Sequence, residues 1–137
     1  NGIDALKKKQ IVLIFPEGET GNFKPSSNAY VLQEFRRGFV RMALETKAPI
    51  IPTLVIGAEE THINLKTIRL SKYLRGLIIP LPLNIIPLPS KWKIIFMEPI
   101  WLPFERSSSK DRELVCELAM EIQEKMQSRL QKELRGL

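Results

Sequence analysis

The chain has 137 residues, of which 44% are hydrophobic and 26% charged, so it can build one domain with a core and is not of the disordered class. A single cysteine, Cys116, excludes an internal disulfide and favours a reducing compartment. The net charge of +6 is compatible with nucleic acid, an anionic membrane surface or an acidic substrate as a partner. It is equally compatible with a basic, solvated surface that binds no charged partner.

The first predicted element is a strand from Ile11 to Phe15. All five residues are apolar and three are β-branched, which is typical of a strand buried on both faces of a sheet. Pro16 ends this strand and Gly18 permits a sharp turn. Glu17 is thereby placed at a strand tip, where open α/β sheets usually carry their chemistry.

A helix and a second strand are predicted next. Apolar residues recur at three- and four-residue spacing from Asn28 to Thr46, which indicates an amphipathic helix. Gly38 would lie in the middle of this helix, where close packing is the expected reason for a glycine. A β-branched run then extends from Ala48 to Gly57. Strand, helix and strand with short links predict a parallel βαβ unit.

The second half predicts a short basic helix from Asn64 to Arg75 and a third strand from Lys91 to Met97. Between them, Leu77–Pro89 is strongly apolar, but it is shorter than the about 20 residues of a membrane-spanning helix. Its four prolines also exclude a regular helix.

A long C-terminal helix follows, with Ser108 and Asp111 as the expected capping pair. Its apolar stripe consists of Leu114, Val115, Leu118, Ile122, Met126, Leu130 and Leu134. No internal domain boundary is visible, so residues 1–137 are expected to form a single domain.

Several kinds of site have no sequence signal. The chain lacks Gly-x-Gly-x-x-Gly, a phosphate-binding loop and Gly-x-Ser-x-Gly. One cysteine and one histidine do not make a typical zinc site, so no metal is predicted. The basic residues are not interleaved with aromatic residues, so nucleic-acid binding remains only a third alternative.

Four ordered blocks resemble the PlsC-like glycerolipid acyltransferases. They are Phe15-Pro16-Glu17-Gly18, the segment Phe35–Leu44 with Ala48–Pro52, the segments Val55–Thr61 and Pro89–Trp92, and Met97-Glu98-Pro99-Ile100. The third block is similar to the diacylglycerol acyltransferase-like subgroup. The resemblance extends from about Leu6 to Leu134.

The resemblance implies an α/β fold, with a mostly parallel sheet flanked by helices. It also implies acyl transfer from acyl-CoA or acyl carrier protein to a glycerolipid hydroxyl, with no further cofactor. The family uses a His-x-x-x-x-Asp motif located before the Phe-Pro-Glu-Gly block. His62, the only histidine, lies after that block and is followed five residues later by Thr67. We therefore expect the C-terminal portion of an incomplete acyltransferase domain, a fragment without its catalytic base and inactive alone.

The substrate-binding residues implied by the resemblance are Phe15, Pro16, Glu17, Gly18, Lys24, Arg36, Arg37 and Pro52. Family members that bind a phosphate-bearing acceptor usually follow Gly18 with Ser or Thr and then Arg, whereas Glu19 and Thr20 stand here. A neutral or different lipid acceptor is therefore favoured, unless Lys24, Arg36 or Arg37 replaces that arginine. For Glu17 the alternatives are a structural carboxylate that accepts backbone N–H bonds in the turn and an ordinary surface glutamate.

The expected location is cytoplasmic and peripheral on an anionic membrane. Trp92 and Trp101 are either interfacial anchors or ordinary core residues. The competing function is a non-catalytic lipid-binding module of the same fold.

Overall fold

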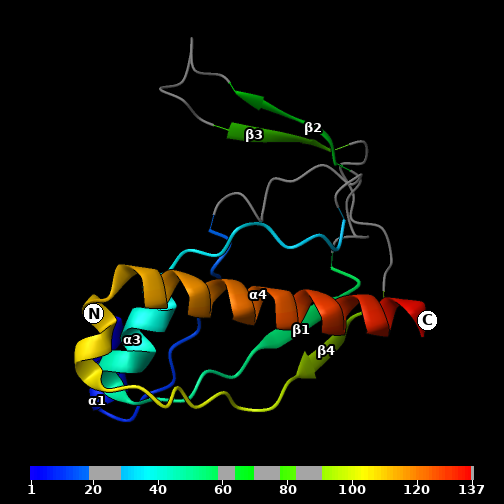
Figure 1. Cartoon of the computed structure of the whole chain (residues 1–137). Coiled ribbons are helices and arrows are strands. Elements are labelled where there is room, and N and C mark those ends of the chain that lie inside the picture. The colour runs from blue at the N-terminus through cyan, green and yellow to red at the C-terminus, as the bar shows by residue number, and fades with distance from the viewer. Residues whose placement is uncertain (19–28, 59–63, 70–77, 83–90, 137) are drawn as a thin grey trace.

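A computed structural model describes residues 1–18, 29–58, 64–69, 78–82 and 91–136 (Figure 1). The helices are α1 (Gly2–Lys7), α3 (Gly38–Thr46), a 3-10 helix (Arg106–Lys110) and α4 (Arg112–Arg135). The strands are β1 (Thr53–Ile56), β2 (Asn64–Arg69), β3 (Ile78–Pro82) and β4 (Lys93–Phe96).

The core forms where α4 packs across α3 and β1 (Figure 1). The predicted stripe of α4 is confirmed, because Val115, Leu118, Ile122, Met126 and Leu130 are buried and Leu114 and Leu134 pack against them. Val40 and Leu44 of α3 meet this stripe and are fully buried. The periodicity of a single long helix thus determines most of the core.

Of the two residues predicted to cap α4, Asp111 does so and Ser108 does not. Asp111 is the N-cap, and its carboxylate accepts a hydrogen bond from the backbone N–H of Leu114 at 3.2 Å. Ser108 belongs instead to the preceding 3-10 helix, whose last turn occupies the residues before Asp111. Aspartate at this position also stabilises the positive end of the helix dipole.

Strands β1 and β4 pair antiparallel, with Leu54 opposite Ile95 and Val55 opposite Ile94. The pairing continues at an isolated bridge between Ile50 and Ile100. Leu54 faces the core and is 3% exposed, whereas Ile94 on the other face is 54% exposed. This small sheet therefore has one buried apolar face and one exposed apolar face.

The turn after β1 requires glycine. Gly57 has φ +97°, and a Cβ at this position would overlap the backbone carbonyl of Lys91. Its N–H donates a hydrogen bond to the hydroxyl of Tyr30 at 2.9 Å. The glycine thus lets the start of the β4 region approach the end of β1.

The prediction of a buried strand from Ile11 to Phe15 is wrong for the described residues. This segment has no strand assignment, and Ile11, Leu13 and Phe15 are 98%, 76% and 74% exposed. The side chain of Val12 approaches Gly2 of α1. An apolar run indicates burial, but it does not identify which residues supply the covering surface.

The helix predicted from Asn28 begins only at Gly38. The backbone N–H groups of Leu32 and Phe35 donate instead to the side-chain Oε1 atoms of Gln127 and Gln123, at 2.7 and 3.1 Å. These side chains of α4 replace the intrahelical acceptors that a longer helix needs. Close packing does not explain Gly38 either, because no atom lies within 4 Å of a Cβ placed there.

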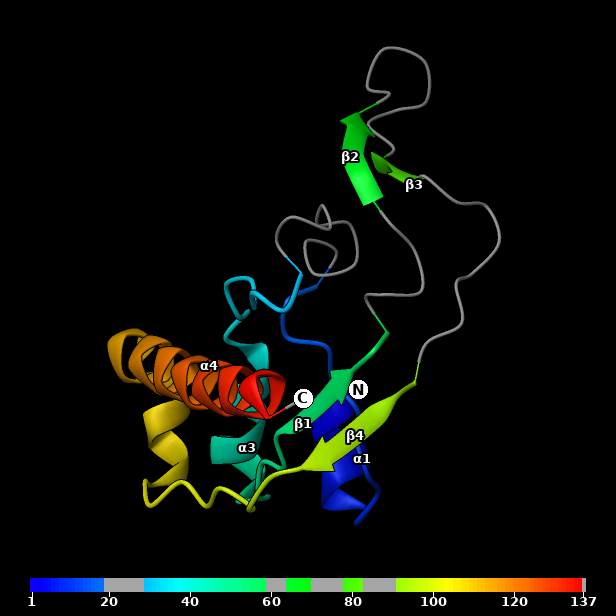
Figure 2. The same ribbon diagram turned by 90° about the vertical axis from the view of Figure 1, so that its right-hand side faces the viewer.

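The short helix predicted from Asn64 is also wrong, because Asn64–Arg69 form β2. β2 pairs antiparallel with β3, with a register shift between Asn64 and Lys66. In both overall views this hairpin lies apart from α3 and α4 (Figure 2). Both ladders in the described ranges are two-stranded and antiparallel. The mostly parallel sheet and the single domain remain predictions.

None of the helices in the described part of the chain has the length and apolar character needed to cross a bilayer.

Candidate functional site

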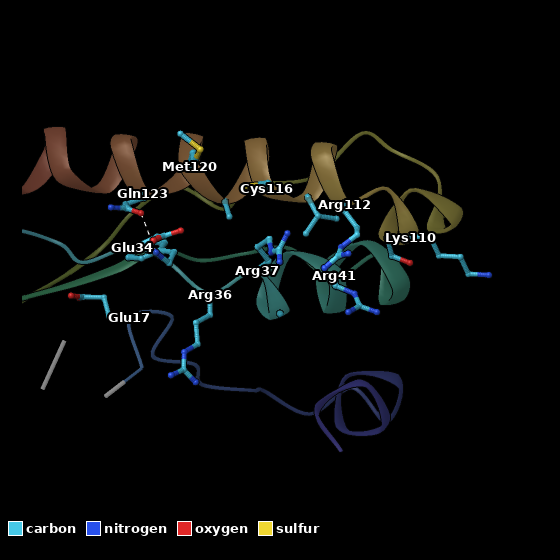
Figure 3. Close-up of a pocket in the computed structure, with 15 residues that line it drawn as sticks. Glu17, Glu34, Arg36, Arg37, Arg41, Lys110, Arg112, Cys116, Met120 and Gln123 are labelled. Atoms are coloured by element: carbon cyan, nitrogen blue, oxygen red, sulfur yellow. Dashed lines mark hydrogen bonds between the residues drawn. The ribbon is translucent and has the colours of Figure 1, made fainter. Parts of the chain in front are cut away.

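An open groove of about 1090 Å³ lies between the segment leading into α3 and the N-terminal half of α4 (Figure 3). Its lining residues are Glu17, Glu34, Phe35, Arg36, Arg37, Gly38, Arg41, Ser109, Lys110, Arg112, Val115, Cys116, Ala119, Met120 and Gln123. Carboxylates lie at one end, and four of the five cationic side chains form the other, with apolar residues of α4 between them (Figure 3).

The turn after Phe15 positions Glu17 at this groove. The N–H of Gly18 donates to the carbonyl of Phe15 at 3.1 Å, and the N–H of Arg36 donates to the carbonyl of Pro16 at 2.8 Å. Gly18 has φ +60°, which glycine adopts without strain. The turn is thereby tied to the segment that enters α3.

The Glu17 carboxylate is half-buried, and its Oε2 accepts a hydrogen bond from the backbone N–H of Gln33 at 2.9 Å. Glu17 therefore does accept a backbone N–H bond, as a structural carboxylate would, but the donor is Gln33 and not a residue of the turn. An ionised carboxylate has several acceptor positions. The same side chain lines the groove, so it can also accept a hydrogen bond from a ligand hydroxyl.

Arg36 lies next to the turn. Its Nε is 2.8 Å from the position that a Cβ on Gly18 would occupy, so any larger residue at 18 would displace this guanidinium. The sequence predicted both residues as substrate-binding, and the structure brings them together. Arg36 is thus the cation of the groove nearest to the Phe-Pro-Glu-Gly turn.

The basic end of the groove is built from two helix starts. Arg37 precedes α3, and Arg41 follows one turn later on the same side of the helix. Lys110 ends the 3-10 helix and Arg112 is the first residue of α4. All four side chains are exposed. The ion pairs among the described residues involve Glu133 with Lys93 and Arg129, and none of these four cations.

The other predicted site residues lie at different places. Phe15, Pro16 and Gly18 form the turn beside the groove but do not line it. Pro52 is buried before β1, and its carbonyl accepts a hydrogen bond from Met97 at 2.9 Å. Lys24, Glu19, Thr20, Glu59, Glu60, Thr61 and His62 are outside the described residues.

Sequence reasoning did not assign Arg41, Lys110 and Arg112 to the site. The overall charge of +6 does not specify which residues gather, and the block Phe35–Leu44 contains Arg41 without singling it out. Their proximity depends on how the 3-10 helix packs against α3. Across the described ranges no group of three His, Cys, Asp or Glu side chains is arranged to hold a metal ion.

Comparisons with known proteins bear on this geometry. Residues 2–56 match the family model described as Acyltransferase. The match supports the acyltransferase family. It covers α1, the Glu17 turn, α3 and β1, and therefore the carboxylate end of the groove together with Arg36, Arg37 and Arg41.

The curated relatives are mycobacterial. Uncharacterized proteins of Mycobacterium bovis and Mycobacterium tuberculosis are each 40% identical over 142 residues, covering 96% of this chain and 40% of theirs. An uncharacterized protein of Mycobacterium leprae is 37% identical, with 39% of its length covered. The chain thus spans about two fifths of the length of these relatives. No solved structure matched the chain significantly.

Proposed function

We propose that the protein transfers a fatty acyl group from an acyl thioester to a lipid hydroxyl, as an enzyme of glycerolipid and phospholipid biosynthesis. The observation that carries this proposal is the position of Glu17. It follows the apolar segment Ile11–Phe15, lies within the part that matches the Acyltransferase model, and lines the groove between the start of α3 and α4. Acyl-CoA or acyl carrier protein is the donor, with no further cofactor.

In this reaction the acceptor hydroxyl attacks the thioester carbonyl. The hydroxyl proton goes to a general base, and the thiol leaves with a proton. Glu17 accepts a hydrogen bond from a hydroxyl of the acceptor and orients it for attack. The base is the histidine of a His-x-x-x-x-Asp motif upstream of residue 1 in the complete polypeptide, because His62 does not stand in that pattern. These 137 residues therefore supply acceptor binding and not the base.

The acceptor is expected to differ from that of the phosphate-reading family members. Glu19 follows Gly18, and a second carboxylate two positions after Glu17 in the sequence disfavours a phosphate. Arg36 beside Gly18 is the one described cation that can offset this repulsion at the turn. A neutral lipid hydroxyl is the acceptor that this arrangement favours.

A peripheral position on the cytoplasmic face of an anionic membrane is part of the proposal. Core packing of the two tryptophans is wrong, since Trp92 and Trp101 are 62% and 67% exposed. Exposed tryptophans suit the headgroup region, and the net charge of +6 favours anionic lipid. Cosedimentation with anionic vesicles, reduced by W92A/W101A (Trp92→Ala with Trp101→Ala), is the expected result. Equal sedimentation of both proteins would contradict this part of the proposal.

One observation favours the second candidate, a lipid-binding module without catalysis. The only histidine of the 137 residues is His62, which lies after the Phe-Pro-Glu-Gly block. A module of this kind binds lipid vesicles but leaves acyl thioesters intact. The two candidates are thus separated by turnover and not by binding.

The test compares the complete polypeptide with its Glu17→Gln and Glu117→Gln variants. Glu117 is exposed on α4 and does not line the groove, so it controls for the loss of one carboxylate. Release of thiol from acyl-CoA in the presence of lipid acceptor should fall on the order of 100-fold for Glu17→Gln, as for loss of an orienting group. Equal rates for both variants would overturn the role of Glu17.

A further inference from the structure

We propose that Arg37, Arg41, Lys110 and Arg112, together with Ser109, form a phosphate-binding site at the basic end of the groove. This inference rests on the proposed function and deepens it, because it assigns a ligand group to the end of the groove that lies away from Glu17. The ligand chemistry is a phosphate group. It belongs either to the nucleotide part of a coenzyme A thioester or to a lipid headgroup.

The first argument is charge. The groove is lined by five cationic and two acidic side chains, and the acidic ones, Glu17 and Glu34, lie away from Arg41 and Lys110 (Figure 3). None of the four cations at the basic end makes a hydrogen bond or ion pair with its side chain in the described part of the chain. Like charges that gather without a carboxylate between them repel one another, and a bound anion removes that repulsion.

The second argument is a polar group inside the groove. Ser109 as a whole residue is 5% exposed, and it lines the same space. Its hydroxyl has no hydrogen-bond partner among the described residues, although it lies next to Lys110 in the 3-10 helix. None of the buried polar side-chain atoms in the described ranges lacks a partner, so this unpaired hydroxyl is accessible from the groove and can donate to a ligand oxygen.

The residue types favour phosphate over other anions. Three of the four cations are arginines, whose planar guanidinium groups pair with two phosphate oxygens at once. The arginines come from two elements, α3 and α4, so they approach a ligand from both walls of the groove (Figure 3). A single carboxylate offers too few oxygens to engage all of them.

The rest of the groove restricts the ligand further. Val115, Cys116, Ala119 and Met120 of α4 line the space beyond the cations and are apolar or weakly polar. A molecule that reaches from Arg41 to Glu17 must therefore carry a phosphate, a less polar middle and a reacting end. Acyl-CoA has this sequence of groups, whereas a phospholipid would place only its headgroup phosphate at the basic end.

The experiment uses the complete polypeptide and its R41Q/R112Q variant. The control is K125Q/R135Q, which removes the same charge from exposed positions of α4 outside the groove. Two probes separate the sources of phosphate, namely free coenzyme A by titration calorimetry and vesicles of phosphatidylcholine with phosphatidic acid by cosedimentation. A second variant, R41K/R112K, keeps the charge but loses the paired donors of arginine.

We expect R41Q/R112Q to lose about tenfold or more in affinity for one of the two probes, and K125Q/R135Q to lose little. A loss confined to coenzyme A assigns the site to the donor nucleotide, and a loss confined to vesicles assigns it to a lipid phosphate. Equal losses in both charge variants, or none, would overturn the site.

The proposed function can fail separately from this site. Glu17→Gln should lower transfer on the order of 100-fold while leaving coenzyme A or vesicle affinity unchanged, because Glu17 lies at the other end of the groove. If the complete polypeptide binds coenzyme A or vesicles normally but shows no turnover, the proposed enzymatic function is wrong and the proposed phosphate-binding site still stands. R41K/R112K should bind more tightly than R41Q/R112Q if charge contributes.

Discussion

The carboxylate of Glu17 accepts a hydrogen bond from the backbone N–H of Gln33 at 2.9 Å. The bond connects the turn after the apolar segment to the irregular segment that enters α3. The same carboxylate lines the groove. Glu17 therefore has a structural partner and a ligand-facing position, and these two roles respond differently to mutation.

Replacing Glu17 separates the two roles. Glu17→Gln keeps a carbonyl oxygen for the N–H of Gln33, so the free energy of unfolding should change by less than about 1 kcal/mol. Glu17→Ala leaves this half-buried N–H without an acceptor and should destabilise the protein by about 1–2 kcal/mol. Urea unfolding measures both. A purely structural Glu17 would leave Glu17→Gln fully active.

Gln127 should contribute more to stability than its polarity suggests. Its Oε1 accepts from the N–H of Leu32 at 2.7 Å, and its Nε2 donates to the carbonyl of Tyr30 at 2.9 Å. Gln127→Ala removes both bonds and should lower the free energy of unfolding by about 1–3 kcal/mol. Gln131→Ala is the matched control, since Gln131 is exposed on the same helix. Similar free energies of unfolding for both variants would show that the two hydrogen bonds of Gln127 do not stabilise the fold.

Two glycines should give opposite results when replaced by alanine. Gly57 has φ +97° and no room for a Cβ beside the carbonyl of Lys91, so Gly57→Ala should destabilise by about 3 kcal/mol or more. Gly38 begins α3 with open space around it, so Gly38→Ala should be neutral or stabilising by up to about 1 kcal/mol. Thermal unfolding ranks the two variants, and equal destabilisation would contradict the geometry at Gly57.

Stability should depend on the ionisation of Glu133. The hydrogen bond from Lys93 at 2.7 Å, and then that from Arg129, holds the pKa of this carboxyl below its ordinary value of 4.5. The charged form is favoured in the folded state, so the contribution is complete above the unfolded pKa and is lost as the pH falls through the lower folded pKa.

The comparison of wild type with Glu133→Gln tests this dependence. Wild type should be the more stable of the two at about pH 7, and the difference should shrink at about pH 3. Glu121→Gln, at an exposed position of the same helix, should show no such change. A difference that stays constant with pH would rule out the ion pairs as its origin.

The parts of the fold that could be predicted from sequence are those set by local pattern. The stripe of α4 lies within one continuous helix, so its 3.6-residue period is visible without knowledge of any partner. The start of α3 was misplaced because its competing hydrogen-bond partners, Gln123 and Gln127, are 88 and 95 residues away in the chain. A local sequence pattern carries no information on a hydrogen-bond acceptor so far away in the chain.

The same distinction applies to the groove. Glu17, Arg36 and Arg37 were predicted because they stand in short motifs that a reader can compare with a family. Arg41, Lys110 and Arg112 come together only when the 3-10 helix and α3 pack. The exposure of Ile11–Phe15 was missed for a related reason, since covering residues are a property of the tertiary structure.

The most direct test of the proposed function is a balance of products for the complete polypeptide. Acyl-CoA or acyl carrier protein with a labelled acyl chain is supplied together with lipid acceptors, and free thiol and acylated lipid are both counted. Acyl transfer predicts equal amounts of the two products, falling together in Glu17→Gln. Thiol without acylated lipid, or lipid binding with neither product, would contradict the proposal.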